Sequence, residues 1–236
     1  SQSGRLFAYQ ANPVLGLPAG TGDAVRVGLQ AFPQAEDERD IYIFLGDIGL
    51  LSEDVVTQFR QSFETTSCDM MVLTGAYSGP VESNYYGRIV RVPETDIAGN
   101  ASGQDKGKVI EIREHKDILG LDENTPYEAV YNDHAYAFTR QDLLETREIN
   151  TGVYAFKEAT LRTYIQQLDT DNIQGELMLT DLVHLFNRHG LVVMAEVAKS
   201  EEEILGFNVK SVLRQMESIA CRWAYERLKD TITIVD

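Results

Sequence analysis

The sequence predicts an α/β fold in which a mixed sheet, with most strands parallel, is flanked by helices. Short runs rich in β-branched and aromatic residues alternate with amphipathic helical segments along the 236 residues, as this fold class requires. One run, Ile41 to Leu45 in "IYIFLGDIGL", is apolar on both faces, which is typical of a central strand beneath two layers of helices. With 43% hydrophobic residues the chain fits one large domain, and we interpret residues 1–236 as that domain.

The strands follow from apolar runs that end at turn residues. In chain order they are predicted at Leu6 to Tyr9, Ile41 to Leu45, Met70 to Leu73, Arg88 to Val92, Val109 to Arg113, Gly152 to Phe156, Leu191 to Val197 and Thr231 to Val235.

Two helices are especially clear. The first has apolar residues at i, i+3, i+4 and i+7 from Leu179 to Phe186 and ends before Gly190, which suits a left-handed position after a helix. The second carries a single apolar stripe from Val209 to Trp223, which we expect to pack on the sheet. Pro93 to Lys106 is predicted to be a loop, and Ile118 to Arg147 an acidic excursion with one short helix, acting as a lid or an interface.

Composition excludes several classes of function. A net charge of −16 without a basic cluster argues against nucleic acid and against an anionic membrane surface. No apolar stretch is long enough to span a membrane, and the first residues do not resemble a signal peptide. The two cysteines, Cys68 and Cys221, and the four histidines have no metal-ligand spacing, and we expect a soluble cytoplasmic protein.

Asp47 stands directly after the apolar strand and Gly46. Ligands of open α/β sheets bind at the carboxyl ends of such strands, so this carboxylate is a candidate for a functional site. It is equally suited to capping a turn before "LLSEDV", and its position alone does not decide between the two.

Other polar segments precede or follow the predicted elements. The turn Gly20 to Gly22 before a helix offers bare amides to an anion or a base, although a plain helix entry has the same pattern. Asn150 lies beside a strand, and Asn208 lies where an N-cap residue is expected. "DNIQGELMLTDLV" gathers polar residues at the start of the first clear helix.

Taken in order, these segments resemble the sugar-nucleotide pyrophosphorylases, most closely the uridyltransferase domain of the bifunctional N-acetylglucosamine-1-phosphate uridyltransferase/glucosamine-1-phosphate acetyltransferases. The specific motifs are "YGRIVR", "IREHKD", "EINTGVY" and "NIQGELMLTD", and the resemblance extends from Gln10 onward. It implies a Rossmann-like nucleotidyltransferase fold. It also implies that UTP and N-acetylglucosamine 1-phosphate react to give UDP-N-acetylglucosamine, a cell-wall precursor, and pyrophosphate.

The resemblance implies a role for nine residues. Gln10, Gly20 and Thr21 would contact the nucleotide, and Asp47 and Asn208 would be the catalytic residues that hold Mg²⁺. The sugar would meet Gly87, Glu114, Asn150 and Thr180. The chemistry fits such sparse equipment, because the attacking sugar phosphate is already an anion and needs alignment and charge neutralisation rather than a general base.

The sequence also departs from this family. The glycine-rich loop with a following arginine and lysine is absent, so on this resemblance the first βαβ portion is missing and no β-helix acetyltransferase domain follows. We therefore expect these residues alone to have little turnover, with the missing segment supplied by further residues, by a partner chain or within a homo-oligomer. The alternatives are a pyrophosphorylase for another nucleotide and sugar, and an inactive scaffold that binds a regulatory ligand.

Overall fold

The computed structural model describes residues 20–34, 37–46, 48, 50–204 and 210–229. The predicted strands at Leu6 to Tyr9 and Thr231 to Val235 lie outside these ranges. The helices are α1 (Thr21–Gln30), α2 (Glu53–Thr65), α3 (His115–Leu119), α4 (Arg140–Glu145), α5 (Glu158–Tyr164), α6 (Asp181–Arg188) and α7 (Lys210–Leu228). The strands are β1 (Asp40–Phe44), β2 (Met70–Ala76), β3 (Arg88–Arg91), β4 (Val109–Arg113), β5 (Tyr127–Tyr131), β6 (His134–Phe138), β7 (Glu148–Lys157) and β8 (Val193–Val197).

The main sheet has the order β4-β3-β7-β2-β8, and β1 pairs with β7 beside this path. Strands β1, β2 and β3 are antiparallel to β7, and β8 is parallel to β2. Four strands therefore run in one direction, while β4 and β7 run in the other. The predicted mixed α/β sheet is confirmed, since most of its strands run in one direction. Within the described ranges, however, β2 and β8 are the one pair of hydrogen-bonded neighbours that is parallel.

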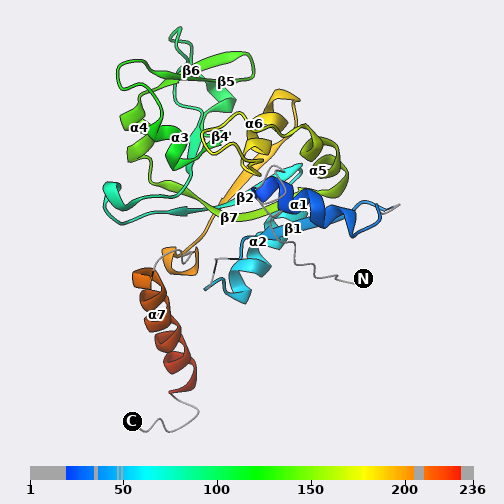
Figure 1. Ribbon diagram of the computed structural model, residues 1–236, viewed down its shortest axis with the longest axis vertical. Helices are drawn as coiled ribbons and strands as arrows, with labels where there is room; N and C mark the ends of the chain where they lie inside the picture. Colours follow the sequence, from blue (N-terminus) through cyan, green and yellow to red (C-terminus); the bar gives the residue numbers. More distant parts are fainter. Residues whose placement is uncertain (1–19, 35–36, 47, 49, 205–209, 230–236) are drawn as a thin grey trace.

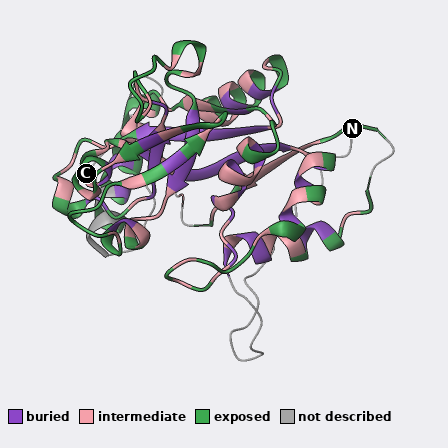
Figure 2. Ribbon diagram, turned by 90° about the horizontal axis from the view of Figure 1, so that it is seen from above, coloured by how far each residue is buried: buried purple, intermediate pink, exposed green. Residues whose placement is uncertain are grey.

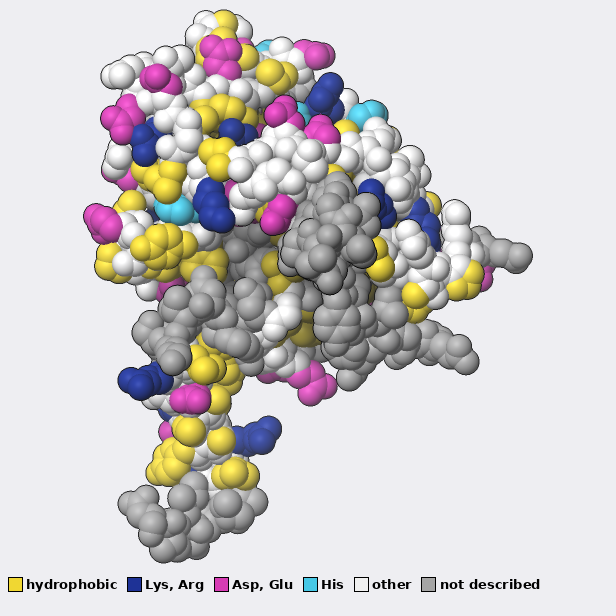
Figure 3. Space-filling view, viewed as in Figure 1, with side chains coloured by type: hydrophobic (Ala, Val, Ile, Leu, Met, Phe, Trp, Pro, Cys, Tyr) yellow, Lys and Arg dark blue, Asp and Glu magenta, His cyan; other side chains and the backbone are white. Residues whose placement is uncertain are grey.

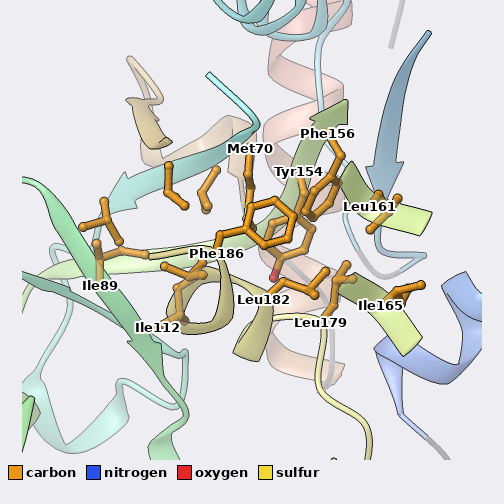
Figure 4. Packing of buried hydrophobic residues seen from close by; sticks show 14 of the residues in the cluster. Met70, Ile89, Ile112, Tyr154, Phe156, Leu161, Ile165, Leu179, Leu182 and Phe186 are labelled. Atoms are coloured by element: carbon orange, nitrogen blue, oxygen red, sulfur yellow. The ribbon is translucent and has the colours of Figure 1, made fainter. Parts of the chain in front are cut away.

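The sheet is covered on both faces (Figures 1 and 2). On one face, Met70, Tyr154 and Phe156 pack against residues of α5 and α6 such as Leu161 and Phe186 (Figure 4). On the other face, the neighbouring residues of β2 and β7 pack against Phe59 and Phe63 of α2. Alternate residues of the same strands thus enter two different cores, which is why Met70 to Leu73 of β2 and Val153 to Phe156 of β7 are apolar without interruption.

The run Ile41 to Leu45 does not occupy the central position that its composition predicted. It forms β1, which among the described strands pairs with β7 alone, and its side chains are only partly buried, Phe44 being 42% exposed. Ile41 and Ile43 touch one core while Tyr42 touches the other. A strand that is apolar on both faces is therefore covered by helices on both sides, but it need not lie at the centre of the sheet. That position belongs to β2 and β7.

The two predicted helices have different outcomes. Helix α6 buries Leu182, Val183 and Phe186, and Gly190 follows it with a φ of +70°, so both predictions are confirmed. The prediction that the later stripe packs on the sheet is wrong. Helix α7 projects from the body, with Met216 and Ile219 of the stripe buried but Leu213 41% exposed (Figure 1).

The excursion from Ile118 to Arg147 contains more structure than predicted. The short helix is present as α4, and β5 and β6 form a hairpin with Asn132 and Asp133 at its turn, both at positive φ. Tyr136 of this hairpin is buried against the residues of β3 and β4. The excursion is therefore packed onto the edge of the sheet at β4.

Candidate functional site

Six of the nine residues implied by the resemblance lie in the described ranges: Gly20, Thr21, Gly87, Glu114, Asn150 and Thr180. Gln10, Asp47 and Asn208 lie outside them. The predicted approach of Asp47 to Asn208 therefore stays a prediction.

Gly87 and Glu114 lie against each other where β3 begins and β4 ends. A Cβ atom placed on Gly87 would stand 3.4 Å from each carboxylate oxygen of Glu114 and 3.2 Å from Ile112. Glycine at this position therefore leaves the carboxylate room beside the main chain. The pairing of β3 with β4 places the two residues together, because Arg88 is opposite Arg113 in the register.

Asn150 of β7 is hydrogen-bonded to this pair of residues through Gly87. Its main-chain N–H donates to the carbonyl of Gly87 at 2.9 Å. Its side-chain amide donates to the Tyr154 hydroxyl at 2.7 Å and accepts from the N–H of Gly152 at 3.2 Å. These bonds fix the orientation of the amide and leave one N–H and one oxygen lone pair for a ligand.

A change of register makes this geometry of Asn150 possible. The pairing of β2 with β7 shifts between Leu73 and Thr74, and Gly152 within the shift has a φ of +80°. The N–H of Leu45 donates to the carbonyl of Gly152, so the residue that precedes Gly46 is tied to the same shift. A positive φ beside a close neighbour is the reason for glycine in "NTG".

Thr180 connects the last predicted sugar residue to Glu114. It precedes α6 and is 3% exposed, yet its side chain makes no capping bond to that helix. Its hydroxyl donates instead to Oε1 of Glu114 at 3.2 Å. Gly87, Glu114, Asn150 and Thr180 therefore form one connected group, the Glu114 cluster.

Burial makes ionisation less favourable for two carboxyl groups, that of Glu114 in the cluster and that of Asp181 beside it. Burial of the carboxyl group raises the pKa of Glu114, and Asp117 adds to this, whereas the Thr180 hydroxyl and the positive charge of Arg88 lower it. Burial also raises the pKa of Asp181 to about 7, with Glu114 as the largest charged contributor. The negative charge of Glu114 therefore makes ionisation of Asp181, which lies next to the cluster in the chain, less favourable.

The turn at Gly20 and Thr21 lies against the segment just before Thr180. The Thr21 hydroxyl accepts from the N–H of Leu179 at 3.0 Å, and the N–H of Gly22 donates to the Leu177 carbonyl at 2.8 Å. The main-chain amide of Gly22, which we expected to be available to a ligand, is therefore hydrogen-bonded within the chain. Gly20 has a φ of +124° and approaches the same carbonyl so closely that a Cβ would stand 2.5 Å from it.

One buried residue beside the cluster was missed. The alternation of "GRIVRV" identified Arg88 as a strand residue, and the structure places it in β3 with 0% of its surface exposed. Alternation gave no signal for this burial, because three consecutive residues from Arg88 onward are buried and Arg91 is a second charged residue of the strand.

The described residues contain no group of three or more His, Cys, Asp and Glu side chains suited to a metal ion. The carboxylate of Asp47 and the amide oxygen of Asn208 are hard donors of the kind that Mg²⁺ prefers. Acidic and basic side chains are interspersed on the face drawn in Figure 3. None of the described helices is both long and apolar enough to cross a membrane.

The sequence is similar to proteins named bifunctional protein GlmU, which confirms the resemblance drawn from the motifs. The protein from Micrococcus luteus is 30% identical over 222 residues, covering 92% of this chain and 38% of the relative. Those from Mycobacterium avium and Mycobacterium ulcerans are 31% and 32% identical and are covered over 33% of their length. The chain therefore spans little more than a third of these curated relatives. No family model matches.

Solved structures give weaker likenesses. A nucleoside-diphosphate-sugar pyrophosphorylase from Vibrio cholerae has a TM-score of 0.47 at 14% identity, covering 84% of this chain and 64% of its own. A CMP:2-keto-3-deoxy-manno-octonic acid synthetase in complex with CTP has a TM-score of 0.49 at 13% identity, covering 86% and 68%. Both scores are below 0.5, so neither likeness identifies a reaction.

Proposed function

We propose, from the homology of this chain to part of the proteins named GlmU, that it is a sugar-1-phosphate nucleotidyltransferase. Its substrates are UTP and N-acetylglucosamine 1-phosphate, and its products are UDP-N-acetylglucosamine and pyrophosphate. The observation that carries the proposal is the convergence of four separate segments in the Glu114 cluster. Each of these segments holds a residue that the resemblance assigns to the sugar.

The polar groups of the cluster suit an N-acetylated sugar. The Glu114 carboxylate accepts hydrogen bonds from sugar hydroxyls, and the oriented amide of Asn150 offers both a donor and an acceptor to the acetamido group. The main chain at Gly87 lies close enough to the carboxylate to meet the same ring. Hydrogen bonds to charged groups are about twice as strong as neutral ones, so Glu114 supplies most of the orientation.

The reaction needs geometry more than acid–base chemistry. An oxygen of the sugar phosphate forms a bond to the α-phosphorus of the triphosphate, and the bond from that phosphorus to the bridging oxygen breaks as pyrophosphate leaves. The attacking oxygen is an anion at neutral pH, so no residue has to remove a proton. The Glu114 cluster holds the sugar so that its phosphate points at the nucleotide. Mg²⁺, held by Asp47 and Asn208, supplies neutralisation of the crowded negative charge when bound.

A substrate screen tests this proposal. Because residues 1–236 alone are expected to have little turnover, the full-length protein is incubated with each nucleoside triphosphate and several hexosamine 1-phosphates, and pyrophosphate release and the mass of the nucleotide sugar are measured. We expect turnover to be greatest with UTP and N-acetylglucosamine 1-phosphate and to be lost in Glu114→Ala, while Glu128→Ala, at an exposed position of β5, retains it. Another preferred pair would reject the assigned substrates, and binding of sugar phosphate without turnover under any condition would favour a regulatory scaffold.

A further inference from the structure

The side chain of Arg88 is enclosed by protein beside the Glu114 cluster. Its guanidinium donates to the main-chain carbonyls of Asn84, at 2.7 Å, and Tyr86. Asn84 is itself 1% exposed, and its side-chain oxygen accepts from the N–H of Tyr86 at 3.3 Å. Arg88 therefore fixes the segment that ends in Gly87.

No carboxylate of the described residues forms an ion pair with this guanidinium, and its Nε has no partner there. A buried positive charge is costly unless negative charge lies near it. The carboxyl group that it influences is that of Glu114, and each of the two groups favours the charged form of the other. Burial lowers the pKa of Arg88, yet arginine stays protonated throughout the physiological range.

Other groups also face Glu114. Asp117 and Lys116 of α3, Asp181 of α6 and Tyr154 of β7 interact with it electrostatically. Lys116 is exposed and its ammonium bonds to Gln174. Arg88 is thus the buried cation of this environment among the described residues.

We propose that Arg88 is a positioning residue of the sugar site, one that fixes the main chain before Gly87 and favours the ionised form of the Glu114 carboxylate, which accepts hydrogen bonds from sugar hydroxyls. The main-chain part rests on the hydrogen bonds to the carbonyls of Asn84 and Tyr86. The part that concerns hydroxyls rests on the proposed function. The electrostatic part does not, because it concerns the free protein.

The electrostatic part is tested by titration of the free protein. Glutamate is labelled with ¹³C at the carboxyl group, Glu114 is assigned with Glu114→Gln, and its pKa is measured in wild type, Arg88→Met and Arg88→Lys. Arg88→Met removes one of the interactions that lower this pKa, so we expect the pKa of Glu114 to rise in Arg88→Met and to stay near the wild-type value in Arg88→Lys. The control is Arg91→Met. It removes another guanidinium of β3, one that is paired with Glu148 of β7, and we expect it to leave the pKa of Glu114 unchanged.

Two additions keep the titration decisive. Because the charge of Glu114 also acts on Asp181, the measurement is repeated in an Asp181→Asn background, where the difference made by Arg88→Met persists. If Arg88→Met does not fold, the double variant Arg88→Met/Glu114→Gln is prepared, and recovery of folding supports the proposal, since the carboxylate left without its cation is then removed. An unshifted pKa in a folded Arg88→Met overturns the electrostatic part of the proposal, as does a double variant that stays unfolded, since the missing charge is then not what prevents folding.

Binding of N-acetylglucosamine 1-phosphate separates this proposal from the proposed function. Calorimetry across pH should show affinity falling as Glu114 takes up a proton, with this fall displaced to higher pH in Arg88→Met and about tenfold weaker binding at pH 7. A wild-type protein that does not bind the sugar phosphate, with a shifted Glu114 pKa in Arg88→Met, rejects the proposed function and retains the electrostatic role. If wild type binds the sugar phosphate and its pH profile is identical to that of Arg88→Met, the electrostatic role of Arg88 is rejected and the proposed function is retained.

Discussion

The hydroxyl of Thr180 donates a 3.2 Å hydrogen bond to Oε1 of Glu114 and so ties the start of α6 to the end of β4. Thr180 occupies the N-cap position but gives no side-chain bond to its own helix. A residue type that ordinarily caps a helix is here directed at a carboxylate. The bond brings together two motifs, "IREHKD" and "NIQGELMLTD", that are more than sixty positions apart in the chain.

Thr180→Val tests that bond. Valine has nearly the same shape but no donor, so the carboxylate loses the bond that favours its charged form. We expect the affinity for sugar 1-phosphate at pH 7 to fall about tenfold, equivalent to about 1.4 kcal/mol, with little change for the nucleotide. Calorimetry measures both, and Thr163→Val, which removes an exposed hydroxyl bonded to its own helix, is the matched control.

Asn150→Ala tests the oriented amide. The change removes the donor to Tyr154 and the acceptor for Gly152, together with the two positions left for the acetamido group. A polar site deprived of a partner loses about 1 to 3 kcal/mol, so KM for the sugar phosphate should rise roughly 5- to 150-fold. Kinetics with the exposed control Asn100→Ala should match wild type. Unaltered use of the sugar phosphate by Asn150→Ala would reject the role of the amide.

Gly152→Ala tests the backbone that aims Asn150. Its Cβ would stand 2.4 Å from Cδ1 and 2.8 Å from Cγ of Leu45, at a φ of +80°. Gly99 has a φ of +84° with open space around it, so Gly99→Ala measures the conformational cost alone. We expect urea unfolding to show a loss in Gly152→Ala larger by about 1 to 3 kcal/mol, the cost of overpacking. Equal losses would mean that the contact with Leu45 carries no weight.

Asp181 gives the protein a pH-dependent stability. Its pKa is 3.8 in the unfolded chain, and burial together with Glu114 raises the pKa to about 7 in the folded chain. Between these values the folded protein retains a proton that the unfolded chain has lost. The contribution is therefore fully present below about pH 4 and is lost as the pH rises to about 7. The N-terminus of α6 favours the carboxylate and reduces the size of this effect.

Asp181→Asn should remove this dependence. Relative to wild type, the variant should gain stability as the pH rises from about 4 to 7, by a fraction of the 1.4 kcal/mol that corresponds to each pKa unit, and the gain should level off above pH 7. Urea unfolding at several pH values measures it. Asp171→Asn removes an exposed carboxyl group and is the control. A difference between Asp181→Asn and wild type that is constant from pH 4 to 8 would contradict the raised pKa.

Strand and helix positions were predictable wherever the periodicity was uninterrupted. The strand at Val109 to Arg113 and the helix before Gly190 agree with the structure, because their apolar spacing matches one element type. The hairpin of β5 and β6 was missed, although "YEAVYNDHAYAF" alternates on both sides of Asn132 and Asp133, a pair suited to a two-residue turn with positive φ. Its acidic composition resembled a loop more than a strand.

The residues of the candidate site were indicated by motif resemblance and not by periodicity. Nothing in the spacing of Gly87, Glu114, Asn150 and Thr180 indicates that they meet, because long-range strand pairing and the start of α6 bring them together. Arg88 could not be recognised because strand alternation does not show which face is buried. The prediction that Ile41 to Leu45 lies at the centre of the sheet was wrong for a related reason. Apolar residues on both faces of a strand indicate that helices cover it, but they do not indicate which strands lie beside it.

Backbone amide NMR of the protein titrated with N-acetylglucosamine 1-phosphate tests the central claim most directly. We predict saturable chemical-shift changes at the amides of Gly87 and Asn150, whose hydrogen bond joins two sides of the cluster, with Gly99 unchanged. The same titration of Glu114→Gln should require about tenfold more ligand, as expected when a charged acceptor is replaced by a neutral one. Absence of saturable changes at Gly87 and Asn150, or changes centred on another part of the chain, would contradict the assignment of the Glu114 cluster to the sugar phosphate.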